Sequence, residues 1–239
     1  MSRGYQLAGV RFGYQRGQPV LACDELRIEP GLTLLLGPNG AGKSTLMKLL
    51  AGVERPHEGT VSLERLDLWV DEVGSRRALA YVPEQPDLTP YASVREVIRL
   101  VSALRSVPLA DAEAALERVG LADVAGRSVR ELSMGQRRRA VLAAAFVGHP
   151  ETLLLDEPLE TLDRSMRELL LGWLGERIND GATVVVSTHE IEPFLDRAIG
   201  IVTVESGVVR WIGLPPDAVA RGRIAEAASR PSHLPNQSS

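Results

Sequence analysis

Short apolar segments alternate with stretches of helical periodicity along much of the chain. Residues 32–36, 152–155 and 183–186 are apolar runs of the length that one buried strand needs. Between the last two runs, residues 166–178 carry apolar side chains at helical spacing. Strands that alternate with helices in this way are typical of a largely parallel sheet. The pattern therefore predicts a protein of the α/β class.

The remaining pattern predicts two additions to this core. Residues 6–12 and 20–28 are short apolar segments separated by Gly and Pro, which favours a small antiparallel sheet. Residues 93–148 turn helical, and Ser93 followed three residues later by Glu96 is typical of a helix start. We interpret this block as an inserted helical subdomain. Further predicted elements are a strand at 78–82 and helices at 44–50 and 110–119.

Composition excludes several classes of protein. The chain has 239 residues, is 44% hydrophobic and has a net charge of −4, so no general attraction to nucleic acid is expected. Its single cysteine, Cys23, cannot form an internal disulfide, which favours a reducing compartment. No segment approaches the roughly 18 apolar residues of a membrane helix. A role at a membrane would therefore depend on a partner. The polar residues 221–239 are predicted to form a flexible tail.

A glycine-rich segment follows the strand predicted at 32–36 and opens the helix predicted at 44–50. It matches the pattern G-x-x-x-x-G-K-[ST], in which backbone N–H groups and a lysine bind phosphates. Lys43 is one of only two lysines among 27 basic residues. A chain that otherwise uses arginine therefore has a lysine at the position where the pattern requires one. The predicted nucleotide-binding residues are Gly37, Pro38, Asn39, Gly40, Ala41, Gly42, Lys43, Ser44 and Thr45. Ser44 is expected to bind Mg²⁺ through its hydroxyl.

Polar residues end two further predicted strands. Asp156 and Glu157 follow 152–155, at the sheet edge where a metal-binding carboxylate belongs beside a phosphate loop. Asp156 is expected to hold Mg²⁺, and Glu157, facing the other way along the pleat, to activate water. Taken alone, the pair can equally be a polar strand end before Pro158. His189, after the strand at 183–186, is a candidate for the γ-phosphate, although a single histidine is more often structural.

Taken together, these motifs resemble the ATP-binding subunits of ABC transporters, over about residues 5–213. The segment 132–136, Leu-Ser-Met-Gly-Gln, resembles the family signature L-S-G-G-Q, with Met134 in place of a glycine. Gln85 lies where the family has its Q-loop glutamine, and residues 187–189 resemble the H-loop. The segment 159–163 resembles the D-loop, with Thr161 in place of a small residue. Tyr14 resembles the aromatic residue that stacks on adenine.

The resemblance implies a fold, a set of ligands and a set of roles. The fold is a P-loop NTPase core with an antiparallel β subdomain and a helical subdomain at about 86–148, all within an ATP-binding domain of residues 1–220. The ligands are ATP and Mg²⁺, with Ser44, Gln85 and Asp156 at the metal and Glu157, His189 and Gln85 as catalytic residues. Ser133, Gly135 and Gln136 begin a helix that would bind the nucleotide of a second subunit, so a homodimer or heterodimer is implied.

The resemblance further implies a function. We expect an ATPase subunit at the cytoplasmic face of the membrane, peripheral to a transmembrane permease subunit that it powers, with export favoured over import. A soluble ATPase acting on nucleic acid or the ribosome is an alternative, as is an importer subunit. An ordinary P-loop kinase or GTPase is disfavoured by the signature and the H-loop. Residues 137–139, all arginine, are interpreted as a solvated helix face and not as a nucleic-acid patch.

The segment between Gln85 and about residue 104 is a candidate contact with the permease. It is apolar for a loop and joins a residue near the γ-phosphate to the helical block. We predict a groove lined by Leu88, Tyr91, Val94 and Ile98 that receives a short helix of the partner. The alternative for Val94 and Ile98 is packing inside the helical block.

Overall fold

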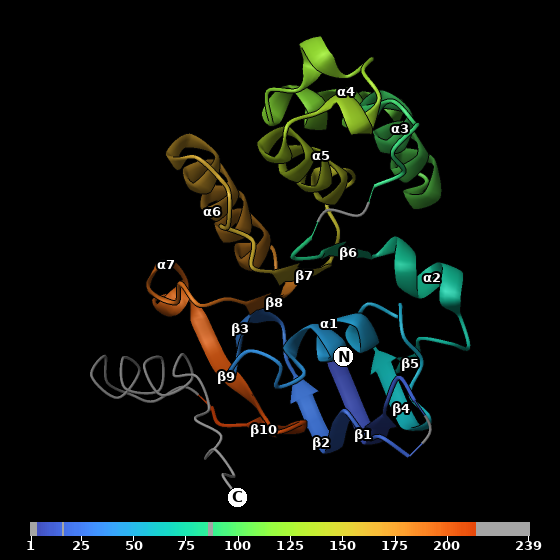
Figure 1. The fold of residues 1–239 in the computed structure, drawn as a ribbon, viewed down its shortest axis with the longest axis vertical. Helices are drawn as coiled ribbons and strands as arrows, with labels where there is room; N and C mark the ends of the chain where they lie inside the picture. Colours follow the sequence, from blue (N-terminus) through green and yellow to red (C-terminus); the bar gives the residue numbers. More distant parts are fainter. Residues whose placement is uncertain (1–3, 16, 86–87, 214–239) are drawn as a thin grey trace, which may run out of the picture.

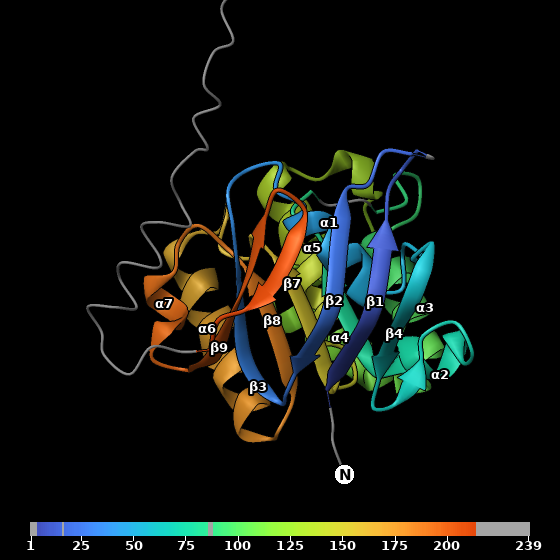
Figure 2. The same cartoon turned by 90° about the horizontal axis from the view of Figure 1, so that it is seen from below.

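The computed structural model describes residues 4–15, 17–85 and 88–213 of the chain. Within these residues one curled sheet has the strand order β5-β4-β1-β2-β10-β9-β3-β8-β7-β6. Figures 1 and 2 show its strands from two directions. The strand bounds are β1 Tyr5–Phe12, β2 Leu21–Ile28, β3 Gly31–Leu36, β4 Glu58–Leu63, β5 Leu66–Asp67, β6 Leu79–Val82, β7 Thr152–Asp156, β8 Thr183–Ser187, β9 Ala198–Glu205 and β10 Val208–Trp211.

The parallel part of the sheet contains β6, β7, β8, β3 and β9. Every residue of β3, β7 and β8 is buried, which explains why these strands appear in the sequence as continuous apolar runs. In β3, Leu34 faces one core and Leu35 the other. The two cores lie on opposite faces of the sheet, so the predicted α/β class is confirmed.

The antiparallel part contains β1, β2, β4 and β5, with β10 linking β2 to β9. The strands predicted at 6–12 and 20–28 are found as β1 and β2, paired with each other. The strands β4, β5, β9 and β10 were not predicted. The tight turn between β9 and β10 has positive φ at Ser206 (49°) and Gly207 (79°), which suits a two-residue hairpin.

Helices cover both faces of the curled sheet. The sheet curls around α1, whose apolar residues lie in the same core as those of β1, β2 and β4 (Figure 1). On the other face, α5 and α6 pack against β3, β7 and β8. The helix bounds are α1 Lys43–Leu50, α2 Glu72–Arg77, α3 Val94–Arg105, α4 Leu109–Arg118, α5 Met134–Phe146, α6 Arg164–Asn179 and α7 Glu192–Leu195, with short 3-10 turns at Ala122–Val124 and Val129–Glu131.

The helices α3, α4 and α5 contact one another and gather at one end of the molecule, beyond β6 and β7 (Figure 1). Ser93 caps α3 as predicted, in a reciprocal capping box with Glu96. The division into an ATP-binding domain at 1–220 with a subdomain at about 86–148 stays a proposal, because one apolar core runs from these helices into the sheet. The tail predicted at 221–239 lies outside the described residues.

Two predictions about side chains in the helical block are wrong. Val94 and Ile98 are fully buried, at 0% exposure, so they pack inside the block and cannot line a surface groove. Arg138 is 1% exposed, although it was predicted to lie with its neighbours on a solvated face. In both cases the packing of α3 and α5 against other elements decides which way the side chain turns.

Candidate functional site

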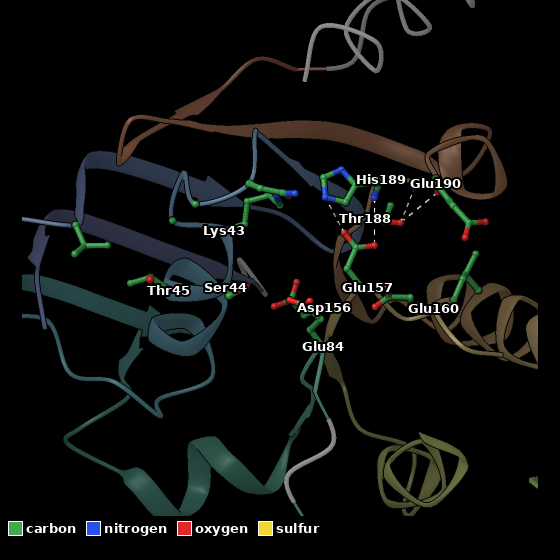
Figure 3. Close-up of a pocket in the computed structure, with 15 residues that line it drawn as sticks. Lys43, Ser44, Thr45, Glu84, Asp156, Glu157, Glu160, Thr188, His189 and Glu190 are labelled. Atoms are coloured by element: carbon green, nitrogen blue, oxygen red, sulfur yellow. Dashed lines mark hydrogen bonds and ion pairs between the residues drawn. The ribbon is translucent and has the colours of Figure 1, made fainter. Parts of the chain in front are cut away.

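A cavity of about 580 Å³ opens where β3, β7 and β8 end (Figure 3). Because parallel strands present their carboxyl ends at one edge of a sheet, the segments that follow these three strands meet there. The cavity is lined by Val20, Asn39, Gly40, Gly42, Lys43, Ser44, Thr45, Glu84, Asp156, Glu157, Leu159, Glu160, Thr188, His189 and Glu190. It therefore brings together residues of the phosphate loop, the acidic pair and the histidine.

The phosphate loop joins β3 to α1 through glycines that cannot be replaced without a shift. A Cβ at Gly37 would lie 2.2 Å from the carbonyl oxygen of Val204, and Gly42, which caps α1, has a φ of 112°. Lys43 is buried, and its Nζ donates to the carbonyls of Gly37 at 2.8 Å and Pro38 at 3.4 Å. Burial lowers the pKa of Lys43, whereas the charge of Glu157 opposes that shift. The loop thus holds a desolvated cation beside the start of a helix.

The acidic pair comes from the end of β7. Asp156 is the last residue of the strand, is 2% exposed and lies opposite Ser187 of β8. The sequence interpretation assumed that Glu157 continues the pleat of the strand. In the structure it does not. Its φ is 46°, and its backbone N–H donates to the carbonyl of Ser187 at 2.8 Å. This left-handed turn, and not strand alternation, places the Glu157 side chain in the cavity.

The carboxylate of Glu157 is poorly solvated. One oxygen, Oε2, accepts from the backbone N–H of His189 at 3.3 Å, and Oε1 is buried and has no hydrogen-bond donor. The side chain is 16% exposed. Burial is the largest cause that raises the pKa of Glu157 to about 7, helped by the charge of Asp156 and opposed by the His189 N–H and by Lys43. Such a carboxyl group can exchange a proton near neutral pH.

His189 lines the cavity beside Glu157 (Figure 3). Its Nε2 lies 3.5 Å from Glu157 Oε1, and its side chain is 43% exposed. Burial and the nearby Lys43 charge lower its pKa, which favours the neutral imidazole. The segment after it is held in place by Glu190, which accepts two bonds from the guanidinium of Arg167 at 2.6 and 3.0 Å.

The remaining predicted residues lie around this cavity and not in it. Tyr14 packs edge to face on Phe12, its hydroxyl is 3.3 Å from Thr45 Oγ1, and it is 54% exposed. Gln85 lines a neighbouring cavity of about 850 Å³, which Ser44 and Asp156 also line. Gly37 and Pro38 act through the carbonyls that bind Lys43. Ala41 is buried inside the loop.

The residues of the predicted signature are separate from the cavity. Ser133 caps α5, and its hydroxyl accepts from the backbone N–H of Gln136 at 3.2 Å. The start of α5, including Gly135, is not part of the cavity lining within the same chain. Met134, beside it, is 70% exposed. This helix start is therefore available to a second molecule.

The sequence analysis did not predict several residues that line the cavity. Glu84, Glu160 and Glu190 add three carboxylates to the cavity, and Thr188 adds a hydroxyl that accepts from the Glu190 N–H at 3.0 Å. The only signal for them was that each adjoins a residue or segment already singled out: Glu84 precedes Gln85, and Glu160 lies in the segment 159–163.

The donors in the cavity fit a hard cation. Ser44 and Asp156 offer a hydroxyl and a carboxylate, the oxygen ligands that Mg²⁺ prefers while it keeps places for water and phosphate oxygens. Across the described ranges there is no cluster of three His, Cys, Asp or Glu residues that could hold a metal without such help. The residues present therefore suit a cation that arrives with a phosphate ligand.

Comparison with known proteins gives a consistent result. The family model for ABC transporters matches residues 24–160. The sulfate/thiosulfate import ATP-binding protein CysA of Mycolicibacterium paratuberculosis is 36% identical over 224 residues, which cover 90% of this chain and 61% of that protein. The chain thus spans about three fifths of the length of this curated relative. Among the described residues, no helix is long and apolar enough to cross a membrane.

Two solved structures of ATP-binding cassettes have the same fold as this chain. The ATP-binding subunit of an ABC transporter matches with a TM-score of 0.81 at 26% identity, covering 95% of each chain. The ATP-binding cassette MJ0796, a dimer in a post-hydrolysis state bound to ADP and Pi, matches with a TM-score of 0.78 at 25% identity. That match covers 89% of this chain and 100% of the other.

The environment of Glu157 predicts a pH-dependent stability. Since its folded pKa is about 7 and its ordinary value 4.5, the free energy of unfolding should fall as pH rises between these values, and then level off. The Glu157→Gln variant has no carboxyl group to ionise here, so its free energy of unfolding should not fall in this way. Without nucleotide, its melting temperature should equal that of the wild type near pH 4.5 and exceed it at pH 8, by the equivalent of a few kcal/mol.

Glu160→Gln, which removes an exposed carboxylate from the same cavity, is the matched control and should follow the wild-type profile. Thermal unfolding measured from pH 4.5 to 8 decides the matter. Parallel profiles for Glu157→Gln and the wild type would show that the Glu157 carboxylate is not destabilised by its surroundings.

Proposed function

The chain belongs to the ABC transporter family of ATP-binding and ATP-hydrolysing proteins, and we propose that it powers transport by a separate transmembrane permease. The observation that carries this proposal is the meeting of the phosphate loop, Asp156, Glu157 and His189 in one cavity. ATP would bind there together with Mg²⁺, which Ser44 and Asp156 would hold and Gln85 would contact. Mg²⁺ supplies charge neutralisation at the phosphates when it is bound.

The roles of the residues follow from their chemistry. Lys43 exchanges its loop carbonyls for phosphate oxygens, and the loop N–H groups complete the cradle. Glu157 accepts the proton of the attacking water, a task suited to a carboxylate whose pKa lies near neutrality. His189, neutral and beside Glu157, donates to the γ-phosphate, and Gln85 orients the water from the neighbouring cavity.

Two ATP-binding subunits act together in this proposal, as a homodimer or a heterodimer. The start of α5, with Ser133, Gly135 and Gln136, is an exposed helix N-terminus that suits an anion bound by another molecule. The related cassette MJ0796 was solved as a dimer, which supports the arrangement. Each nucleotide would then lie between the phosphate loop of one subunit and the signature of the other.

A role on nucleic acid is less well supported. Of the three consecutive arginines, Arg138 is buried, Arg139 pairs with Asp163, and Arg137 bonds to the carbonyl of Arg130. The segment therefore offers no free basic patch, and the net charge of −4 agrees.

The sequence favours export, whereas the relative CysA is named for import of sulfate and thiosulfate, so export receives no support from that relative. The chain would lie at the cytoplasmic face of the membrane, peripheral to its partner. Contact with that partner is proposed at Tyr91, which is 78% exposed, and at the half-buried Leu88 beside the cavity of about 850 Å³.

The role of Glu157 predicts a separation of binding from turnover. Glu157→Gln should bind ATP as the wild type does and lose about 10²–10⁴-fold in steady-state hydrolysis, because the general base is gone. With ATP and Mg²⁺ it should form dimers that light scattering detects. Glu151→Gln, which alters an exposed carboxylate outside the cavity, is the control. Turnover within tenfold of the wild type would rule out this role for Glu157.

The position of Tyr14 predicts an effect on nucleotide affinity. If adenine stacks on its ring, Tyr14→Ala should weaken ATP binding by about 0.5–1.5 kcal/mol beyond the loss of buried area, so at least roughly 2-fold in Kd, and Tyr14→Trp should be tolerated. Titration of ATP and thermal unfolding without nucleotide are measured together. A lower melting temperature with unchanged affinity would mean that Tyr14 only packs on Phe12.

The proposed partner contact predicts a loss of assembly. Tyr91→Glu should keep the basal ATPase rate and abolish co-purification with the permease, because it places a charge on an exposed apolar contact. Leu66→Glu, at a 54% exposed apolar residue on the edge strand β5, is the matched control and should co-purify normally. Unchanged co-purification and transport by the Tyr91 variant would place the contact elsewhere.

A further inference from the structure

Arg138 is the one member of the arginine run 137–139 that turns inward. It belongs to α5, five residues after the cap Ser133, and is 1% exposed. Helix α5 packs against β6 and against the apolar face of β7. The guanidinium therefore lies between the helical block and the edge of the sheet that carries the cavity.

Four backbone carbonyls receive its hydrogen bonds. Nη1 donates to Pro83 and to Glu84, the latter at 3.0 Å. Nη2 donates to Asp156 at 3.1 Å and to Glu157 at 2.6 Å. The first pair immediately precedes Gln85, and the second pair is the acidic pair itself. One side chain of α5 thus joins two segments that the proposed function uses, the one before Gln85 and the acidic pair.

The Arg138 guanidinium is a buried charge that backbone carbonyls, and not a carboxylate, hold in place. Burial is the largest cause that lowers the pKa of Arg138, and the carboxylates of Glu160 and Asp156 oppose that shift. Within the described residues no carboxylate oxygen lies within 4.0 Å of it, so carbonyl groups provide its close contacts. The planar fork of a guanidinium can bind two pairs of carbonyls at once, whereas the single nitrogen of a lysine cannot.

The bond to Glu157 acts on a strained backbone. Glu157 has a φ of 46°, a conformation that non-glycine residues adopt only when their surroundings hold it. Its N–H donates to Ser187 and its carbonyl accepts from Arg138, so the peptide groups on both sides are fixed. Fixing both groups aims the Glu157 side chain at the cavity.

We propose that Arg138 is a positioning residue for ATP hydrolysis, which holds Glu157 and the segment before Gln85 in their working geometry against helix α5. This inference rests on the proposed function, because it presumes that Glu157 activates water. Arg138 does not line the main cavity, so nucleotide binding does not need it. Its loss should therefore act on turnover and leave affinity unchanged.

The chain offers a matched control for this idea. Arg105 is a half-buried arginine that also donates to four carbonyls, those of Ala144, Ala145, Val147 and Leu79. It binds the other end of α5 and the start of β6, and it does not touch the backbone of Asp156 or Glu157. Removing either guanidinium breaks four comparable bonds, but only one set belongs to the proposed catalytic segments.

The test compares the purified variants Arg138→Gln, Arg138→Lys and Arg105→Gln with the wild type. For each, kcat, KM and the Kd for ATP are measured with the melting temperature, at a temperature where all are folded. Both Arg138 variants should lose roughly 10- to 100-fold in kcat, because small displacements of a reacting group cost that much. Their Kd for ATP should stay within about threefold of the wild type. Arg105→Gln should melt earlier and keep its kcat.

Three outcomes would overturn the proposal. These are a kcat of the Arg138 variants within about threefold of the wild type, a loss of ATP affinity that matches the loss of kcat, and an equal loss of kcat in Arg105→Gln. If Arg138→Gln does not fold, Arg138→Lys decides alone. Glu157→Gln separates the two hypotheses: if it remains active the proposed role of Glu157 fails, and if it is inactive beside active Arg138 variants only this inference fails.

Discussion

The register between β8 and its two parallel neighbours is the constraint on which the site depends. Ser187, the last residue of β8, lies opposite Leu35 of β3 on one side and Asp156 of β7 on the other. The bond from the Glu157 N–H to the Ser187 carbonyl locks this register one residue beyond the strand. A slip by one residue would exchange the two faces of a strand that is buried on both sides. The phosphate loop, the acidic pair and His189 meet because all three strands end in step.

This arrangement concentrates charge that the protein alone does not balance. Asp156, Glu157, Glu84 and Glu160 face the same cavity as Lys43, which in the described structure binds loop carbonyls. Burial is the largest cause of the raised pKa of Glu157, and the nearby charge of Asp156 adds to it. A magnesium ion with a phosphate chain would supply both missing partners, a cation for the acids and an anion for Lys43 and the start of α1. The electrostatics of the cavity thus suit a metal-bound polyanion better than either ion alone.

Sequence patterns predicted the buried strands and the phosphate loop, because a strand buried on both faces must be apolar throughout. They missed the strands β4 and β5, since only Val61 and Leu63 of β4 are buried and β5 is an edge strand of two residues, so neither has much hydrophobic pattern. They also missed β9, a largely apolar strand whose run of side chains is interrupted by Gly200. The turn at Glu157 could not be predicted, because its left-handed φ is imposed by bonds to Ser187 and Arg138. Three consecutive arginines look alike in sequence, and only packing determines that Arg138 is the buried one.

The position of Arg138 on α5 links the two halves of the proposed shared site. Ser133 and Arg138 are five residues apart, about 7–8 Å along the helix axis. The exposed helix start and the buried guanidinium therefore move as one body. If a second subunit's nucleotide displaced α5, the carbonyls of Glu84 and Glu157 would either follow it or lose their bonds to a buried charge. Each such loss costs about 1–3 kcal/mol, more than a small backbone adjustment. Following the helix is thus the favoured response, and under the proposed function a displacement of α5 would reach Glu157, the proposed general base, through this one side chain.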